Sequence, residues 1–144
     1  MSTATTVVPR ATALTAGAEA PQRTYGPITR SDLVRYAGAG GDFNPIHHDE
    51  TFARDAGLES VFSMGMFHAG LLSSLVGGWL GVENVRRFAL RFTGQVWPDD
   101  VLTLSGVVDG IEEHDGARLA TCSFTVARQT GDVVITATAT AIAS

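Results

Sequence analysis

The sequence predicts an α+β domain in which an antiparallel sheet wraps around one long, buried helix. Its 144 residues suit a single domain, and 44% of them are hydrophobic, enough to build a core. Residues 60–82 contain no Asp, Glu, Lys or Arg and are small or apolar on every side, which is typical of a central helix. The chain that follows is rich in Val, Thr, Leu and Ile and contains turn signals, which indicates a run of antiparallel strands.

The first helix is expected within residues 27–40. Thr29 is its possible N-cap, and Asp32 lies three residues later, which is the spacing of a capping box. Either Gly38 or Gly40 can end it, because glycine readily adopts the left-handed conformation found after helix C-termini.

Two more helices and four strands are expected after it. The second helix begins at its N-cap Asp49 and stops at Gly57, and the central helix covers about residues 65–80. The four strands are expected within residues 84–96, 100–114, 117–129 and 132–143. Four aromatic side chains are expected in the core: Trp79, Phe88, Phe92 and Phe124.

The N-terminal segment, residues 1–20, is rich in Ala and Thr and lacks the continuous apolar stretch of a secretory signal. We expect a flexible tail or a first edge strand there, followed by one domain over residues 21–144. The central segment is long enough to raise the question of a membrane span. Its glycines, serines and one histidine favour the buried helix of a soluble domain instead, so no membrane partner is expected.

Charge and cysteine content exclude further functions. The net charge of −5 argues against a nucleic-acid partner, because phosphate binding needs clustered Lys and Arg. Arg86, Arg87 and Arg91 could contact the phosphates of one small molecule, but solvated strand charges are the simpler interpretation. Cys122 is the one cysteine, so no disulfide can form within the chain, and we expect a buried, inert thiol in a cytoplasmic protein.

Residues 41–50, "GDFNPIHHDE", concentrate polar side chains in an otherwise apolar sequence. A metal site is not expected there. His47 and His48 are adjacent and point apart in regular structure, and the chain has no HxxxH, HxH or HExxH spacing. A calcium loop starting at Asp42 fails at Ile46 and at Ala53, positions that need an oxygen ligand.

Acid–base chemistry requires Asp42 and His47 to meet. Five residues apart, they would lie about 140° apart around a helix and on opposite faces of a strand, so only a bent loop brings them together. Asn44-Pro45 is a strong turn signal, and the Asn44 side chain can hold the bend through the backbone. Spacing alone leaves two alternatives, a catalytic pair or a loop cap beside an ordinary surface histidine, and it favours the second.

The stretch "YAGAGGDFNPIHHD" resembles the hydratase motif of the MaoC-like dehydratases, the (R)-specific enoyl-thioester hydratases of the hotdog superfamily. The family pattern is G-D-x-N-P-[LIV]-H-x-D after an aromatic residue. "VFSMGMFHAGLLSSLVGGWLG" resembles the central helix of that fold, and the likeness extends from about residue 20 to the C-terminus. The resemblance implies a single hotdog fold. It also favours the catalytic pair of Asp42 and His47 over the loop cap and surface histidine that spacing alone favoured.

The resemblance also implies a reaction, the reversible hydration of trans-2-enoyl thioesters to (3R)-3-hydroxyacyl thioesters. Asp42 and His47 match the catalytic pair, with Asn44 in a supporting role. No cofactor is implied, since coenzyme A or acyl carrier protein is part of the substrate. The backbone N–H of Gly65 matches the donor to the thioester oxygen, and the neighbouring Met66 is placed with it in substrate binding.

Ser73 aligns with a serine that supports the catalytic pair in some members of the family. An ordinary helix serine bonded to its own preceding turn explains it about as well. Met64 stands where the family usually has His, and "PDD" at 98–100 replaces P-G-D. His48 is expected to face solvent, and His68 is expected to be a buried histidine with its hydrogen bonds satisfied.

Two alternatives remain beside the hydratase: a hotdog thioesterase, and a subunit of a heteromeric dehydratase that works only with a partner. Thioesterases do not need the G-D-x-N-P-x-H loop, and non-catalytic partners lack the Asp–His pair. A single hotdog leaves a sheet edge exposed, so we expect a homodimer or a heterodimer with another hotdog subunit.

Overall fold

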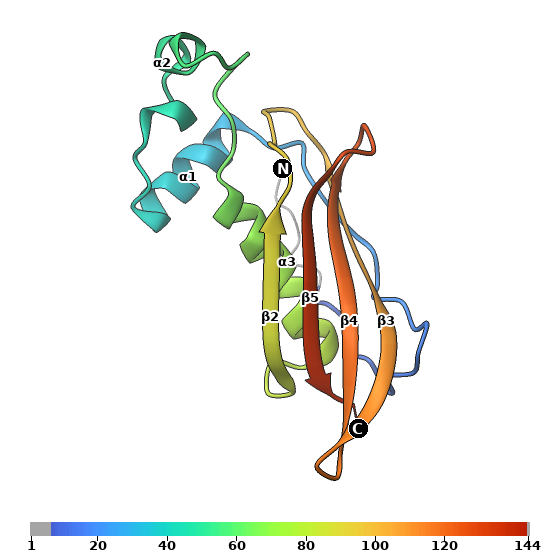
Figure 1. Cartoon of the computed structure of the whole chain (residues 1–144). Coiled ribbons are helices and arrows are strands. Elements are labelled where there is room, and N and C mark those ends of the chain that lie inside the picture. The colour runs from blue at the N-terminus through green and yellow to red at the C-terminus, as the bar shows by residue number, and fades with distance from the viewer. Residues whose placement is uncertain (1–6, 144) are drawn as a thin grey trace.

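The computed structural model describes residues 7–143 and confirms an antiparallel sheet that curves around a central helix (Figure 1). Its elements in chain order are β1 (Arg23–Tyr25), α1 (Arg30–Gly40), the 3-10 helix η1 (Pro45–His47), α2 (Glu50–Asp55), α3 (Gly65–Leu80), β2 (Val85–Phe92), β3 (Leu102–His114), β4 (Ala117–Arg128) and β5 (Val133–Ile142). The strand order is β1-β3-β4-β5-β2, and all neighbours are antiparallel.

Strand β2 departs from the simple meander that the sequence indicates. It pairs with β5 instead of the next strand, β3. Its connection to β3, residues 93–101, is longer than the roughly 2–5 residues of an ordinary hairpin loop, so the chain crosses the end of the sheet. Strands β3, β4 and β5 do follow one another as hairpins.

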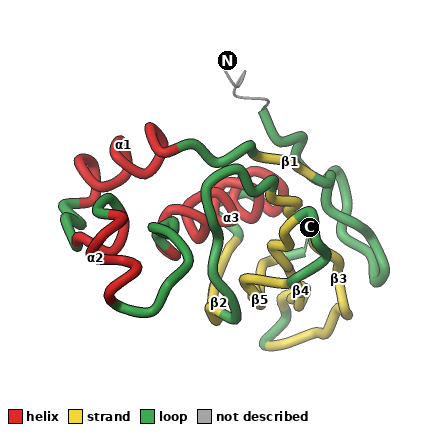
Figure 2. The backbone as a smooth tube through the Cα atoms, turned by 90° about the horizontal axis from the view of Figure 1, so that it is seen from above, coloured by secondary structure: helices red, strands yellow, loops and turns green. Residues whose placement is uncertain are grey.

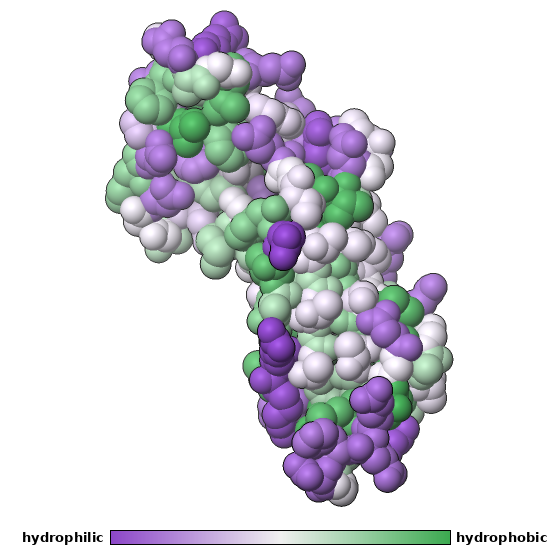
Figure 3. All heavy atoms as spheres, in the orientation of Figure 1, coloured by the Kyte–Doolittle hydropathy of each residue, from purple (hydrophilic) through white to green (hydrophobic). Residues whose placement is uncertain are grey.

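Small side chains on one face of β5 let α3 lie close to the sheet. Ala137, Ala139 and Ala141 are buried on the inner face, while Thr136 and Thr138, which alternate with them along the strand, are exposed. This alternation has the two-residue period of a strand with one face on the core. Figure 3 looks onto the outer face of the sheet, where side chains of intermediate hydropathy prevail.

The aromatic residues expected in the core divide into two groups. Trp79 of α3 and Phe124 of β4 are buried and meet edge to face with centroids 6.1 Å apart, and Phe88 packs partly buried against the same core. The expectation for Phe92 was wrong, because its side chain is 47% exposed. It lies at the end of β2, beyond the central core, and lines a cavity beside the start of α3.

Helices α1 and α2 lie to one side of the sheet, near one of its ends (Figures 1 and 2). The capping box of Thr29 and Asp32 is present at the start of α1, as expected. The helix ends at Gly40, one of the two glycines expected to end it. The left-handed residue that follows it is Gly41, with φ 68°.

The start of α2 is capped by the Asp49 side chain, and Gly57 lies in the turn after the helix, as expected. Glu50 ties this helix to its surroundings. Its Oε1 lies 2.5 Å from the guanidinium of Arg30 in α1 and accepts a 2.7 Å hydrogen bond from Ser60. The Glu50 end of residues 41–50 is therefore tied to α1 and to the chain that precedes α3.

The N-terminal segment follows α3 and the edge of β3 as irregular chain over residues 7–22. The Ala11 N–H donates to the Trp79 carbonyl (2.9 Å), and the Gly17 N–H donates to the Val108 carbonyl (2.8 Å). The expectation of a tail or edge strand also covers residues 1–6, which lie outside the described residues.

Two further features bear on the sequence expectations. Within residues 7–143, no helix is both long and apolar enough to cross a membrane. Cys122 is buried in β4, where burial and, to a lesser degree, Asp109 raise the pKa of the thiol to about 11. The thiol is therefore protonated at neutral pH and unreactive.

Candidate functional site

A cavity of about 350 Å³ lies beside the N-terminus of α3. The loop after α1 contributes Asp42 and His47 to its lining, and the start of α3 contributes Gly65 and Met66. Phe92 at the end of β2 closes another side. Four residues singled out in the sequence thus meet at one cavity, although 18 positions separate His47 from Gly65.

Asp42 and His47 face each other across the bend. Asp42 Oδ2 lies 3.7 Å from His47 Nε2, too far for a direct hydrogen bond. A single water molecule or substrate hydroxyl can bridge two polar atoms at this separation. The Asp42 side chain is partly exposed, whereas His47 is buried, so the pair spans the boundary between solvent and cavity.

The orientation of His47 is set by its other ring nitrogen. Nδ1 lies 2.6 Å from the carbonyl oxygen of Phe62, and the Phe62 ring packs edge-on at a centroid distance of 4.8 Å. A carbonyl can only accept, so Nδ1 carries the proton and donates it. In neutral His47, Nε2 therefore presents a lone pair toward Asp42.

The loop between them is bent by local hydrogen bonds. Asn44 Oδ1 accepts from the Ile46 N–H (3.1 Å), while the Asn44 N–H donates to Asp42 Oδ1 (3.3 Å). Pro45 then begins the 3-10 turn that carries His47. Asn44 is not part of the cavity lining, so it acts on the pair through the backbone.

The start of α3 presents backbone N–H groups to the cavity. Among residues 7–143, neither Gly65 N nor Met66 N has a hydrogen-bond acceptor. A Cβ atom added to Gly65 would lie 2.8 Å from the Phe92 ring, so only glycine fits without displacing that ring. The positive end of the helix dipole and these free donors favour a partial negative charge here.

A buried polar pair that the sequence reasoning did not identify also lines the cavity. His68 Nε2 lies 2.8 Å from Ser63 Oγ, and the two residues are 3% and 2% exposed. Burial, opposed in part by Asp100, lowers the pKa of His68 to about 4. His68 is therefore neutral and hydrogen-bonded, as expected, but Ser63 gave no sequence signal beyond its place before the helix.

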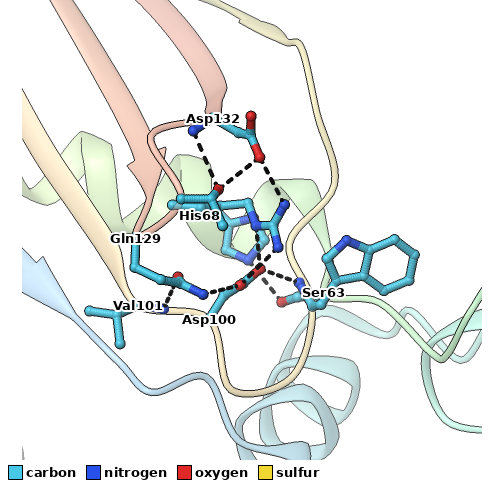
Figure 4. A network of polar contacts seen from close by, with 9 residues as sticks. Ser63, His68, Asp100, Val101, Gln129 and Asp132 are labelled. Carbon is cyan, nitrogen blue, oxygen red and sulfur yellow. Dashed lines mark hydrogen bonds and ion pairs between the residues drawn. The ribbon is translucent and has the colours of Figure 1, made fainter.

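Asp100 lies nearby in a network of polar contacts (Figure 4). Arg128 reaches its carboxylate with two nitrogens at 2.7 and 3.1 Å, and Gln129 donates at 2.8 Å. Burial alone would raise the pKa of Asp100, but Arg128, the Trp97 N–H and Gln129 together hold it below its ordinary value. Asp100 is thus an ionised, fully paired anchor of the turn at residues 97–101.

Other candidate residues lie apart from the cavity. Ser73 is exposed and donates to the Ala69 carbonyl at 2.8 Å, the bond of an ordinary helix serine. His48 is exposed, with Nε2 3.3 Å from the Phe43 carbonyl. None of the described residues forms a cluster of three or more His, Cys, Asp or Glu that could hold a metal ion. Three arginines are also outside the lining of this cavity: Arg86, Arg87 and Arg91.

Comparison with known proteins places these features in context. The sequence profile described as "MaoC like domain" matches residues 12–130. The chain is 36% identical over 101 residues to a 3-hydroxybutyryl-CoA dehydratase of Methylorubrum extorquens, which covers 67% of this chain and 64% of that protein. It is 31% identical over 87 residues to an (R)-specific enoyl-CoA hydratase of Rhodospirillum rubrum, covering 58% of this chain and 60% of that protein.

Longer and assembled proteins are similar as well. The fatty acid synthase beta subunit TOXC of Cochliobolus carbonum is 35% identical over 69% of this chain, which corresponds to 5% of that subunit. A chain of the ChsH1-ChsH2 complex from Mycobacterium tuberculosis superposes with a TM-score of 0.75 at 25% identity, over 90% of this chain and 98% of that one. This chain spans less than two thirds of the length of the dehydratase, the hydratase and the fatty acid synthase subunit.

Proposed function

This chain belongs to the MaoC-like dehydratase family, and we propose that it catalyses the reversible hydration of trans-2-enoyl thioesters to (3R)-3-hydroxyacyl thioesters. The observation that carries the proposal is the facing pair at the cavity, with Asp42 Oδ2 3.7 Å from His47 Nε2. The names of two relatives, an (R)-specific enoyl-CoA hydratase and a 3-hydroxybutyryl-CoA dehydratase, support the same chemistry.

In the proposed mechanism, one water molecule binds between Asp42 and His47. The pair accepts one proton from this water as its oxygen bonds to the β-carbon of the enoyl thioester. The same proton equivalent is then delivered to the α-carbon, so one water is consumed and the pair is regenerated. Because His47 donates through Nδ1 to a backbone carbonyl, its Nε2 is free for this transfer.

The addition of water builds negative charge on the thioester oxygen. The free N–H groups at the start of α3 would bind that oxygen, and Gly65 allows the thioester to approach the backbone closely. Met66, 61% exposed at the cavity, would contact the acyl thioester. This arrangement needs no cofactor, because the coenzyme A or acyl carrier protein is part of the substrate.

We also propose that the protein works as a dimer with a second hotdog subunit, either identical or different. Three apolar side chains near the cavity are exposed in the single chain: Phe43, Met66 and Phe92. Strand β2 also leaves one sheet edge unpaired within the described residues, and exposed strand edges favour association. The likeness to a chain of a two-component complex supports the heteromeric alternative.

The decisive experiment is hydration of crotonyl-CoA by the purified protein, alone and with co-expressed candidate partners. We expect Asp42→Asn and His47→Ala each to lower kcat/KM at least about a hundredfold, as the loss of a general acid–base does. The matched control is His48→Ala, which removes the exposed neighbouring imidazole and should retain activity. Wild-type rates in both pair variants would show that Asp42 and His47 do not form the active site.

A further inference from the structure

The three α-helices within residues 7–143 begin in two different ways. Thr29 and Asp49 cap α1 and α2 with side-chain oxygens. At the start of α3 the N-cap residue is Met64, which makes no side-chain capping bond to any described residue, and the first turn contains no acidic residue. Its N–H groups therefore remain available, but the helix lacks the usual means of fixing where the chain turns into it.

A different contact bridges the start of α3. Ser63 directly precedes the N-cap, and His68 is the fourth residue of the helix. Apolar residues at these two positions commonly pack together and set the angle at which the chain joins the helix. Here the contact is the 2.8 Å hydrogen bond between Ser63 Oγ and His68 Nε2, with both residues almost completely buried.

The Ser63 backbone strengthens this arrangement. Its N–H donates to the Val96 carbonyl at 2.8 Å, which ties the segment before the helix to the loop after β2. The residue is thus fixed through its backbone on one side and its side chain on the other. Both Ser63 and His68 line the cavity with Gly65, so a shift of the pair would move the wall that carries the free N–H groups.

We propose that Ser63 and His68 are a positioning pair, which replaces a helix cap and holds the N–H groups at the start of α3 toward the thioester oxygen. This inference rests on the proposed hydration of enoyl thioesters. The Ser63–His68 bond fixes this turn without engaging any N–H group of its first residues, so the N–H groups of Gly65 and Met66 stay free for the substrate. The neutral imidazole of His68 transfers no proton in this role, because Ser63 already occupies its Nε2.

The first test separates kcat from KM. Ser63→Ala and His68→Leu should each lower kcat about tenfold, less than the roughly 10²–10³ that follows loss of a whole oxyanion donor, with KM changed by no more than about twofold. His68→Gln should restore kcat to within about threefold of wild type, because its amide nitrogen reaches the position of Nε2. The control Ser105→Ala removes another partly buried hydroxyl bond, 3.0 Å to Thr125, and should leave kcat unchanged.

The second test needs binding but no turnover. Butyryl-CoA, labelled with ¹³C at its carbonyl, lacks the double bond that is hydrated. Hydrogen bonds to its carbonyl oxygen should lower the carbonyl stretching frequency in the wild type, and this shift should decrease in Ser63→Ala and His68→Leu. It should persist in Asp42→Asn, whose start of α3 is intact.

The outcomes distinguish the positioning role from the proposed function. Wild-type kcat and carbonyl shift in Ser63→Ala and His68→Leu, together with lost activity in Asp42→Asn, would overturn the positioning pair alone. A purely structural pair would lower the melting temperature in His68→Leu without changing either readout. Full activity in Asp42→Asn and His47→Ala would overturn the proposed active site, and the carbonyl shift would still decide the role of Ser63 and His68.

Discussion

Two segments line the same cavity, and each contributes one buried histidine. In the loop after α1, His47 donates through Nδ1 to the Phe62 carbonyl, which leaves Nε2 open toward Asp42. In α3, His68 has its Nε2 engaged by Ser63. Burial is similar at the two sites, so the partner of each ring nitrogen, and not burial, separates a histidine suited to proton transfer from one suited to holding structure.

The two segments also present different kinds of groups. The loop offers side chains, held by the short-range hydrogen bonds of Asn44. The start of α3 offers backbone N–H groups, and its glycine lets another molecule approach them. A substitution in the loop can thus remove a reacting side chain. A substitution at the start of α3 leaves the backbone N–H groups in place and changes only their position or the access to them.

The largest effect expected at the helix start follows Gly65→Ala. The new Cβ would lie 2.8 Å from the Phe92 ring and would obstruct the approach to the free N–H groups. We expect kcat for crotonyl-CoA to fall about a hundredfold, as small misplacements at reacting centres can cause. Steady-state kinetics of the purified variant would measure this.

Gly70→Ala is the matched control in the same helix, since a Cβ there meets nothing within 4 Å. It should keep wild-type kcat and gain about 0.5–1 kcal/mol in the free energy of unfolding, because alanine favours helix more than glycine does. Equal kcat in both variants would remove the start of α3 from the site.

An intermediate effect is expected on stability at low pH. The pKa of His68 is about 4 in the folded protein and 6.5 ordinarily, so the unfolded chain binds the extra proton between these values. The stability that comes from keeping His68 neutral is fully present above pH 6.5 and is lost as the pH falls toward 4. The free energy of unfolding should fall by up to roughly 3 kcal/mol over this range. Urea unfolding at pH 7 and at pH 4.5 should show a smaller loss in His68→Gln than in wild type.

This comparison isolates His68, because the wild type and the variant share Asp100, whose lowered pKa also destabilises the fold in acid. Identical pH dependence in the two proteins would contradict a neutral, buried His68 in the folded state.

The smallest effect concerns the turn that supports the helix-start segment. Asp99 has a left-handed backbone with φ 72°, a conformation that glycine adopts without strain. Asp99→Gly should raise the free energy of unfolding by about 0.5–1 kcal/mol and leave kcat unchanged. Asp99→Ala, which keeps a Cβ, should show no such gain in chemical denaturation; equal gains in both would rule out backbone strain as the cause.

The parts of the fold that local rules decide were predictable. The capping box at Thr29, the N-cap at Asp49 and the central helix over residues 65–80 all follow from hydrogen bonds and periodicity within a few residues. Errors occurred where distant segments decide. Phe92 is apolar and lies in a strand, but only the position of α3 determines that its ring covers Gly65 instead of entering the core.

The candidate site divides in the same way. Asn44-Pro45 predicts the bend between Asp42 and His47, and the resemblance of the motif identifies these two residues as the candidate pair. Nothing local indicates that Phe62 orients His47, since that contact depends on how the segment before α3 passes the loop. Ser63 and His68 flank the same helix start, but the sequence reasoning did not identify their hydrogen bond. Ser73, by contrast, makes a contact that local rules do predict. It donates to the Ala69 carbonyl one turn earlier, as an ordinary helix serine does.

By itself, therefore, the sequence determined most of the helices and strands and the bent loop, because hydrogen bonds and steric limits between near neighbours govern both. The choice of Asp42 and His47 for hydration chemistry came from the resemblance of their motif, since spacing alone favoured a surface histidine. Only the tertiary structure decided that the loop, the start of α3 and the end of β2 close around one cavity. That convergence depends on the sheet curving around the helix, and packing between segments far apart in the chain leaves no pattern in any single segment.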